Sequence, residues 1–361
     1  MERSFIDFHV IQTVPPSCIN RDDSNSPKTA IYGGVLRARV SSQCWKYAMR
    51  KFFREHFDED QLSVRTKKIV ELVIKEIEKL DPSLAGAPAT RLAEDVISQA
   101  GIKLSEPDEK RRKKDAGEPR ETGALFFMSK WQAANLATLA VNGNTDRKDA
   151  KDALCKGHGV DIALFGRMVA DDSMLKVSAS SQVAHAISTH HVDNDFDFFT
   201  AMDEMAPVAG MLSTTGFNSS TLYRYAALAV HVLHDNLGNG KITSQAVAEF
   251  ARAFIMSMPT GKQNSFANRN LPDAVMVTMR HDQPVSLAGA FEEPVKLAGG
   301  GYKSQSIQKM EEYALFEYSN YVKPPVETYV IGDDFDRLAG VSPVKRLTVD
   351  ELVTLLSVKN F

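Results

Sequence analysis

The sequence predicts an α+β protein in which a helical insertion interrupts a core containing a β-sheet. Both ends of the chain contain stretches with strand alternation, residues 60–155 show helical spacing, and strand and helix patterns mix from about residue 160. The chain of 361 residues is 43% apolar and 25% charged, which is typical of a globular protein with a sizeable core.

Two strands are expected before residue 42. Residues 4–14 alternate between apolar and polar side chains, and a proline pair and a polar loop follow. A second strand is expected from about Ala30 to Val40, with Arg37 and Arg39 on one face.

A helix follows, because Ser41 or Ser42 can cap its N-terminus. Its apolar residues have the spacing of a buried stripe. They are Trp45, Ala48, Met49, Phe52 and Phe53. Polar residues recur along the opposite edge, at Gln43, Lys46, Arg50 and Arg54.

The rest of the chain alternates between helical and strand patterns. Helices are expected at 90–101, 123–141, 221–237 and 243–257, and at the end of the chain in TVDELVTLL. Strands are expected from about residue 160, with SQVAHAISTHHV (181–192) the clearest, and again at 274–279.

The composition limits what the protein can bind. Lys and Arg total 43 against 46 acidic residues, so the formal charge is −3 and any polyanion site must be a local patch. The three cysteines, Cys18, Cys44 and Cys155, are too few and too widely spaced for a disulfide framework or a cysteine-rich zinc site. No signal peptide or apolar run of about 20 residues is present, which predicts a soluble, cytoplasmic protein without a membrane partner.

The sequence lacks the common motifs of catalytic and cofactor sites, including the phosphate-binding loop, HExxH and GxSxG. Strand alternation places His190 on the opposite face from His185 and His191, so we expect hydrogen-bonded strand histidines rather than a metal site. Acids in 193–204 match a calcium loop, but Phe198 occupies the position where that loop requires Gly. Neither a metal nor another cofactor is expected.

One basic segment stands out in this mildly acidic chain. From Ser24 to Arg54 there are seven basic residues and no acidic one. They are Lys28, Arg37, Arg39, Lys46, Arg50, Lys51 and Arg54. A solvated, stabilising surface would mix both signs, and the helix N-terminus at Ser41 favours phosphate. These features favour a polyanion-binding track over a solvated charged face.

The same segment carries a resemblance to a known family. Residues 16–51, PSCINRDDSNSPKTAIYGGVLRARVSSQCWKYAMRK, closely resemble the N-terminal signature of the backbone subunit of type I-E CRISPR Cascade (the CasC or "Cas-seven" family). Similar stretches recur at 160–168, 180–204, 217–226, 259–267 and 271–295.

The resemblance implies a fold like a right hand. A palm with a modified RNA-recognition-motif (ferredoxin-like) sheet would span 1–55 and 160–361, and helical fingers would be inserted at 56–159. A hairpin thumb would protrude at about 193–220.

The resemblance also implies the function. Such subunits are non-catalytic and stack head-to-tail along the guide RNA (crRNA), leaving its bases free to pair with target DNA. The implied partners are further copies of the chain, the other Cascade subunits and a separate helicase-nuclease. Contacts to phosphates suit this role, because they impose no sequence preference.

By the family's pattern, the RNA contacts fall on Asn20, Arg21, Lys28, Ser41, Gln43, Lys46, Arg50, Arg167 and Met168. The charge pattern adds Arg37 and Arg39, and Phe199 would be the wedge of the thumb. Tyr47 departs from the family, which often has a basic residue there. The run Lys110–Lys114 is either a solvated loop or an auxiliary nucleic-acid contact.

Two other functions are compatible with the sequence. Related backbone subunits of type III complexes cut target RNA with an aspartate in the first loop, where this chain has Asp22 and Asp23. The second alternative is a free-standing protein that binds single-stranded nucleic acid. Such a protein would need no interface between copies of the chain.

Overall fold

The computed structural model of the protein describes residues 2–107, 118–144, 146–169, 172–202, 204–205, 209–332, 335, 337–340 and 343–361. The Lys110–Lys114 run lies outside these residues. The predicted α+β class is confirmed. Two compact units are present: unit 1 comprises 1–52, 181–231 and 244–361, and unit 2 comprises 53–180 and 232–243.

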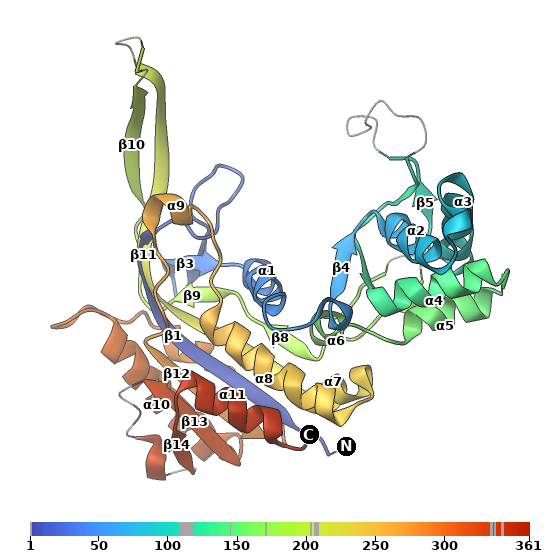
Figure 1. Ribbon diagram of the computed structural model, residues 1–361. Helices are drawn as coiled ribbons and strands as arrows, with labels where there is room; N and C mark the ends of the chain where they lie inside the picture. Colours follow the sequence, from blue (N-terminus) through green and yellow to red (C-terminus); the bar gives the residue numbers. More distant parts are fainter. Residues whose placement is uncertain are drawn as a thin grey trace. The chain divides into compact units, whose positions relative to one another are not determined.

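Unit 1 is built on a mainly antiparallel sheet (Figure 1). Its strands are β1 (Phe5–Ser17), β2 (Thr29–Tyr32), β3 (Val35–Val40), β8 (Ser181–Val183), β9 (Ala186–Ser188), β10 (Asp195–Met202), β11 (Ala209–Ala229), β12 (Ala274–Arg280), β13 (Glu327–Gly332) and β14 (Val344–Arg346). The order is β14-β13-β12-β1-β11-β9-β3-β2, and β8 and β10 also pair with β11.

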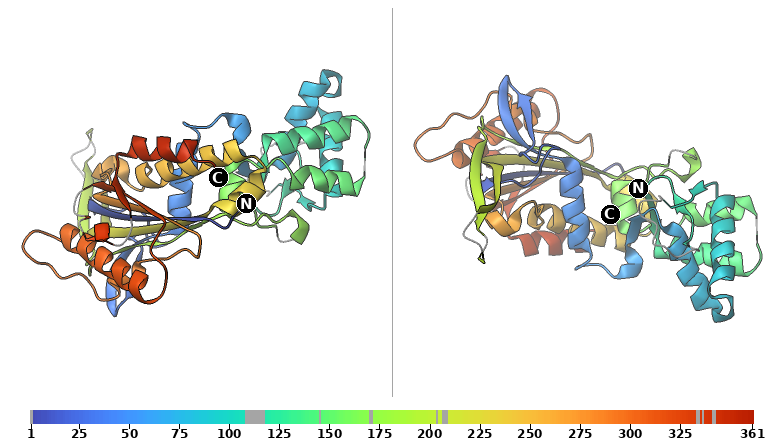
Figure 2. Two further views of the ribbon diagram at one scale, coloured as in Figure 1. Left: turned by 90° about the horizontal axis from the view of Figure 1, so that it is seen from below. Right: turned by 90° about the horizontal axis from the view of Figure 1, so that it is seen from above.

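Helices cover both faces of this sheet. On one face, Phe8 of β1 contacts Phe250 and Phe254 of α8 (Gly240–Met256), with ring centroids 5.5 and 6.0 Å apart. On the other, Ile11 belongs to the same buried cluster as Met310 of α10 (Lys303–Asn320). The C-terminal helix α11 (Val349–Val358) lies alongside α8 (Figure 2). The predicted strand at 4–14 is therefore present, but both of its faces are buried.

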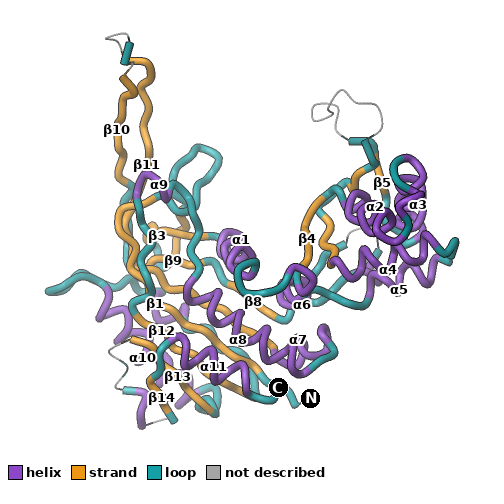
Figure 3. The backbone as a smooth tube through the Cα atoms, viewed as in Figure 1, coloured by secondary structure: helices purple, strands orange, loops and turns teal. Residues whose placement is uncertain are grey.

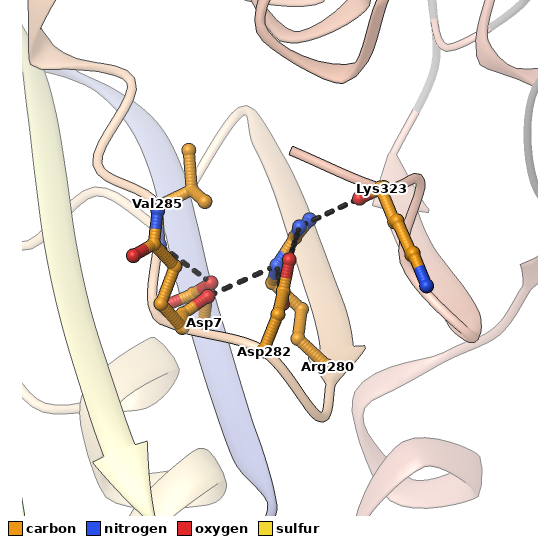
Figure 4. A network of polar contacts seen from close by, with 6 residues as sticks. Asp7, Arg280, Asp282, Val285 and Lys323 are labelled. Atoms are coloured by element: carbon orange, nitrogen blue, oxygen red, sulfur yellow. Dashed lines mark hydrogen bonds and ion pairs between the residues drawn. The ribbon is translucent and has the colours of Figure 1, made fainter. Parts of the chain in front are cut away.

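A buried polar network joins β1 to the end of β12 (Figure 4). The Asp7 carboxylate accepts hydrogen bonds from the Tyr225 hydroxyl (2.8 Å) and the Val285 backbone N–H (3.1 Å). Nearby, the Arg280 guanidinium pairs with Asp282 at 2.8 Å and donates to the Lys323 carbonyl at 2.6 Å. Burial raises the pKa of Asp7 to about 7, against the lowering effect of its hydrogen bonds.

Unit 2 is largely helical (Figure 3). Its elements include β4 (Ser63–Thr66), α2 (Ile69–Leu80), α3 (Ala87–Gln99), β7 (Phe126–Ser129), α4 (Lys130–Val141), α5 (Arg147–Cys155) and α6 (Val160–Phe165). Val73, Ile97 and Leu136, from three different helices, are fully buried in one cluster. No helix among the residues described has the length and apolar character needed to cross a membrane.

Several predicted boundaries are wrong. Residues 221–229 belong to β11 rather than to a helix, because a strand covered on both faces has a continuous apolar run like that of a buried helix. Residues 126–129 form β7, and Ser129 then caps α4 through its hydroxyl, which accepts from the Gln132 N–H at 3.1 Å. Residues 160–165 form α6 where strands were expected.

The strand predicted from Ala30 to Val40 is a hairpin of β2 and β3. Gly33 and Gly34 form its turn with φ angles of +59° and +76°, which L-residues with side chains rarely adopt. At Gly33 there is also no space for a side chain, because a Cβ atom would lie 1.7 Å from the Glu292 carbonyl oxygen. The Gly-Gly pair was the available sequence signal for this turn.

Candidate nucleic-acid interface

The first loop, residues 18–28, is ordered by its own hydrogen bonds. The Asp22 carboxylate accepts from the backbone N–H groups of Ser24 and Ser26 (3.0 and 2.9 Å) and from the Ser24 hydroxyl (2.8 Å). The hydrogen bond from this hydroxyl is the main reason that the pKa of Asp22 is lowered. Asp22 therefore acts as the cap of a turn in this loop.

Asn20 connects this loop to the basic helix α1 (Ser42–Phe53). Its side-chain oxygen accepts the backbone N–H of Ser41 at 2.9 Å, while its carbonyl accepts the N–H of Lys28 at 2.8 Å. The Ser41 hydroxyl in turn accepts the N–H of Cys44 at 3.4 Å, so the predicted cap is confirmed. The loop and the positive end of the helix dipole are thus held side by side.

Four titratable or basic side chains gather around the start of α1: those of Lys28, Arg39, Cys44 and His185. The Arg39 guanidinium donates to Nδ1 of His185 at 3.1 Å and to the Thr29 carbonyl at 3.1 Å. Burial lowers the pKa of His185, and the charges of Arg39 and Lys28 lower it further. Burial raises the pKa of the Cys44 thiol, and Lys28 opposes that effect. The Arg39 N–H also donates to the Lys28 carbonyl at 2.9 Å, so these two basic residues are adjacent and the local field is positive.

The exposed edge of α1 continues this positive region. Gln43 is exposed, Lys46 and Arg50 are partly exposed, and burial lowers the pKa of Lys46. Tyr47, which departs from the family pattern, is 58% exposed, and the Lys51 ammonium lies 5.3 Å from the centre of its ring. The buried stripe predicted for α1 is confirmed for Trp45, Ala48, Met49 and Phe53, whereas Phe52 is only partly buried.

Arg37 does not belong to this surface. Its side chain is fully buried and donates to the carbonyl oxygens of Tyr32, Ser188, Phe291 and Glu292 at 2.8–3.2 Å. The expectation that Arg37 shares an exposed face with Arg39 is wrong, because residues 288–292 cover the Arg37 side chain.

Two of the predicted contacts lie in unit 2. Arg167 is 3% exposed and donates to the carbonyls of Leu175, Phe127 and Leu154 and to the Gln132 side chain. Its guanidinium therefore holds the interior of unit 2 together, and burial lowers its pKa to about 10. The neighbouring Met168 is 86% exposed.

The segment expected to form the thumb contains a hairpin of β10 and β11, and the aromatic residues of β10 are not in the core. Phe196 and Phe198 are 66% and 65% exposed, and Phe199 is 39% exposed. The register places Phe199 opposite Ser213 and Phe198 opposite Thr214, so these two rings lie on opposite faces of the hairpin.

The structure adds one cation that the sequence analysis did not assign. Lys262 lies at the base of this hairpin, where its ammonium donates to the Thr215 hydroxyl at 2.8 Å. Its charge, like that of Arg21, acts on the Cys18 thiol, whose pKa is raised mainly by burial. The family-like stretch PTGKQNSFA (259–267) was the sequence signal that could have indicated it.

No group of three or more His, Cys, Asp or Glu is placed to hold a metal within the part of the chain that the structure describes. The hydrogen bonding expected for His190 is confirmed. Its Nε2 accepts the backbone N–H of Thr221 at 3.0 Å, and its ring stacks on Tyr302 with centroids 3.6 Å apart.

The fold of the chain is similar to that of chains in two solved RNA-guided complexes. One similar chain comes from a solved structure described as "CRISPR RNA-guided surveillance complex, pre-nicking". It is 30% identical, the match covers 98% of this chain and 99% of that one, and the TM-score is 0.79. Another, from a "CRISPR RNA-guided surveillance complex", is 27% identical over 98% of this chain and 100% of that one, with a TM-score of 0.71.

The CT1975-like protein family matches residues 6–355, and the chain belongs to this family. No curated protein matches the chain. The resemblance to the Cascade backbone family is therefore confirmed at the level of the family.

Proposed function

We propose that the protein is a non-catalytic backbone subunit that binds crRNA and presents it to target DNA in a CRISPR surveillance complex of type I-E. The observation that carries this proposal is the cluster of cations around the N-terminus of α1, in particular Lys28, Arg39 and Lys46, in a chain of net charge −3. Phosphate-directed cations of this kind suit a guide of arbitrary sequence.

In this proposal the sheet of unit 1 is the modified RNA-recognition palm, unit 2 is the fingers, and the β10–β11 hairpin is the thumb. The RNA contacts are Asn20, Arg21, Lys28, Arg39, Ser41, Gln43, Lys46 and Arg50, with Met168 contributed by the fingers. Copies of the chain stack head-to-tail along the RNA beside other Cascade subunits, and a separate helicase-nuclease cuts the target DNA.

Co-expression with a CRISPR array and the neighbouring subunits tests this function. We expect a large particle that contains several copies of the chain and RNA of one defined length. Purification of the chain as an RNA-free monomer under the same conditions would contradict the proposal.

The assembled complex is expected not to cut complementary RNA. Asp22 is held by three hydrogen bonds within its own loop. Among the residues that the structure describes, no group of three or more His, Cys, Asp or Glu is placed to hold a metal ion beside it. Complementary RNA is incubated with the complex and Mg²⁺ or Mn²⁺, and the products are separated on a gel. Cleavage that disappears in Asp22→Ala or Asp23→Ala would instead support the type III-like endoribonuclease.

Phe199→Ala is expected to leave the melting temperature of the isolated subunit nearly unchanged, because the ring is 39% exposed. In assembled wild-type complexes we expect unpaired nucleotides to recur at regular intervals along the guide–target duplex. The substitution should remove this regular pattern. An aromatic ring can replace part of the stacking that is lost when a nucleotide is splayed out. Chemical probing of the guide–target duplex measures this periodicity.

Phe198→Ala is the matched control, since this ring is more exposed and lies on the other face of the hairpin. It should leave the periodicity intact. If Phe199→Ala lowers the melting temperature strongly and the periodicity persists, then Phe199 stabilises the folded subunit and does not separate nucleotides of the RNA.

A further inference from the structure

Three non-glycine residues have left-handed backbone conformations among the residues that the structure describes, and they lie in two loops. Asn25 (φ +67°) is in the first loop, while Lys262 (φ +46°) and Ala267 (φ +48°) flank the short helix α9 (Gln263–Phe266). Asn tolerates this conformation, but it is unfavourable for Lys and Ala. Backbone strain of this kind concentrates at functional sites.

The segment that contains α9, residues 259–270, is attached to the base of the β10–β11 hairpin. The Lys262 ammonium donates to the Thr215 hydroxyl at 2.8 Å. The ring of Phe266 packs against Phe217, with centroids 5.8 Å apart. Thr215 and Phe217 are two residues apart on β11, so both contacts are made with one face of the hairpin.

The same segment also touches the first loop. A Cβ atom on Gly261 would lie 2.0 Å from the carbonyl oxygen of Ile19, so the two backbones approach closely and only glycine fits. On the hairpin, a Cβ atom on Gly216 would lie 3.1 Å from Pro27. The first loop, the hairpin base and residues 259–270 therefore meet at one place.

We propose that Lys262, next to α9, is a second phosphate-binding residue of unit 1, whose ammonium contacts the RNA backbone at the base of the hairpin. This inference rests on the RNA-binding function proposed above. It extends the binding surface from the start of α1 to the other side of the first loop.

The chemistry of Lys262 fits a phosphate ligand. An ammonium group has three N–H donors, and the Thr215 hydroxyl engages one of them. Lys262, Arg21 and Asp22 all act on the pKa of the Cys18 thiol, and the Asp22 carboxylate is already bound by its own loop. A compact cation that contacts phosphate adds affinity without sequence preference.

Strain and charge can be separated by two glycine substitutions. Lys262→Gly removes both the strain and the cation, whereas Ala267→Gly removes the same kind of strain and leaves the cation in place. Both full-length variants are compared with the wild-type chain by thermal melting and by binding of an unstructured single-stranded RNA over a range of salt concentrations.

We expect Ala267→Gly to raise the melting temperature and to bind RNA as the wild type does. Lys262→Gly should bind several-fold more weakly, and its salt slope should fall by about 0.7, which corresponds to one phosphate contact on a single strand. Lys262→Arg, which keeps the charge, should retain most of the affinity and the wild-type slope.

Unchanged affinity and slope in Lys262→Gly would overturn this inference while leaving the proposed function standing. A wild-type chain that does not bind RNA would overturn both. If Lys262→Gly fails to fold, Lys262→Asn provides the same test, because Asn tolerates the left-handed backbone without a charge. The inference then fails if Lys262→Asn binds like the wild type.

Discussion

Replacement of both Lys46 and Arg50 by alanine is expected to weaken RNA binding and to lower the salt slope by about 1.4. Each phosphate contact on a single strand contributes about 0.7 to the slope of log affinity against log salt concentration. Both side chains lie on the polar edge of α1 and are partly exposed. Fluorescence anisotropy with RNA oligonucleotides of two unrelated sequences measures the change, which should be equal for both.

The control is the double replacement of Lys323 and Lys345, which removes the same formal charge from exposed positions. Lys345 lies on β14, at the opposite edge of the sheet from β2 and β3. If this control lowers the slope as much as the α1 variant does, RNA binding follows net charge, and α1 has no special part in it.

Arg37→Met is expected to destabilise unit 1 by about 3 kcal/mol or more. Arg37 is fully buried and donates to four carbonyl oxygens, and each buried acceptor left without a donor costs about 1–3 kcal/mol, partly offset by relaxation. Urea denaturation followed by intrinsic fluorescence measures the loss in the free energy of unfolding.

Arg39→Met is the matched variant, two positions along the same strand. Arg39 is partly exposed, so its replacement should cost about 1 kcal/mol or less but weaken RNA binding. We assign Arg37 a role in stability and none in RNA binding. This assignment is wrong if Arg37→Met is as stable as the wild type but binds RNA more weakly and with a lower salt slope.

This difference between Arg37 and Arg39 could not be predicted from the sequence. Strand alternation places both side chains on one face, and charge suggests that this face is solvated. The burial of Arg37 depends on residues 288–292, which are far away in the sequence. Phe291, for example, is 254 positions from Arg37. Local patterns carry no information about such packing.

Other parts of the surface were predictable because their signals are local. The cap at Ser41, the buried stripe of α1 and the basic edge opposite it all follow from helix geometry. The chain segment 221–229 shows the opposite case. Its apolar residues fit a helix and a doubly covered strand equally well, and only the pairing of β11 with β1 decides between them.

Lys262 shows a further limit of sequence patterns. Glycine and asparagine in a sequence indicate positions where a left-handed backbone conformation is favourable. Lys and Ala give no such indication, although Lys262 and Ala267 both have this conformation. Lys262 contacts Thr215 at the hairpin base, and the adjacent Gly261 lies against Ile19, so these segments come together only in the folded unit.

Cross-linking of the RNA-bound complex tests the central claim, that crRNA lies on the surface around the start of α1. The complex is irradiated with ultraviolet light, and peptides that carry a nucleotide are identified by mass spectrometry. We predict that most cross-links in unit 1 map to residues 18–28, 41–52 and 259–270. Cross-links confined to the edge of the sheet around β13 and β14, with none in these three segments, would contradict the claim.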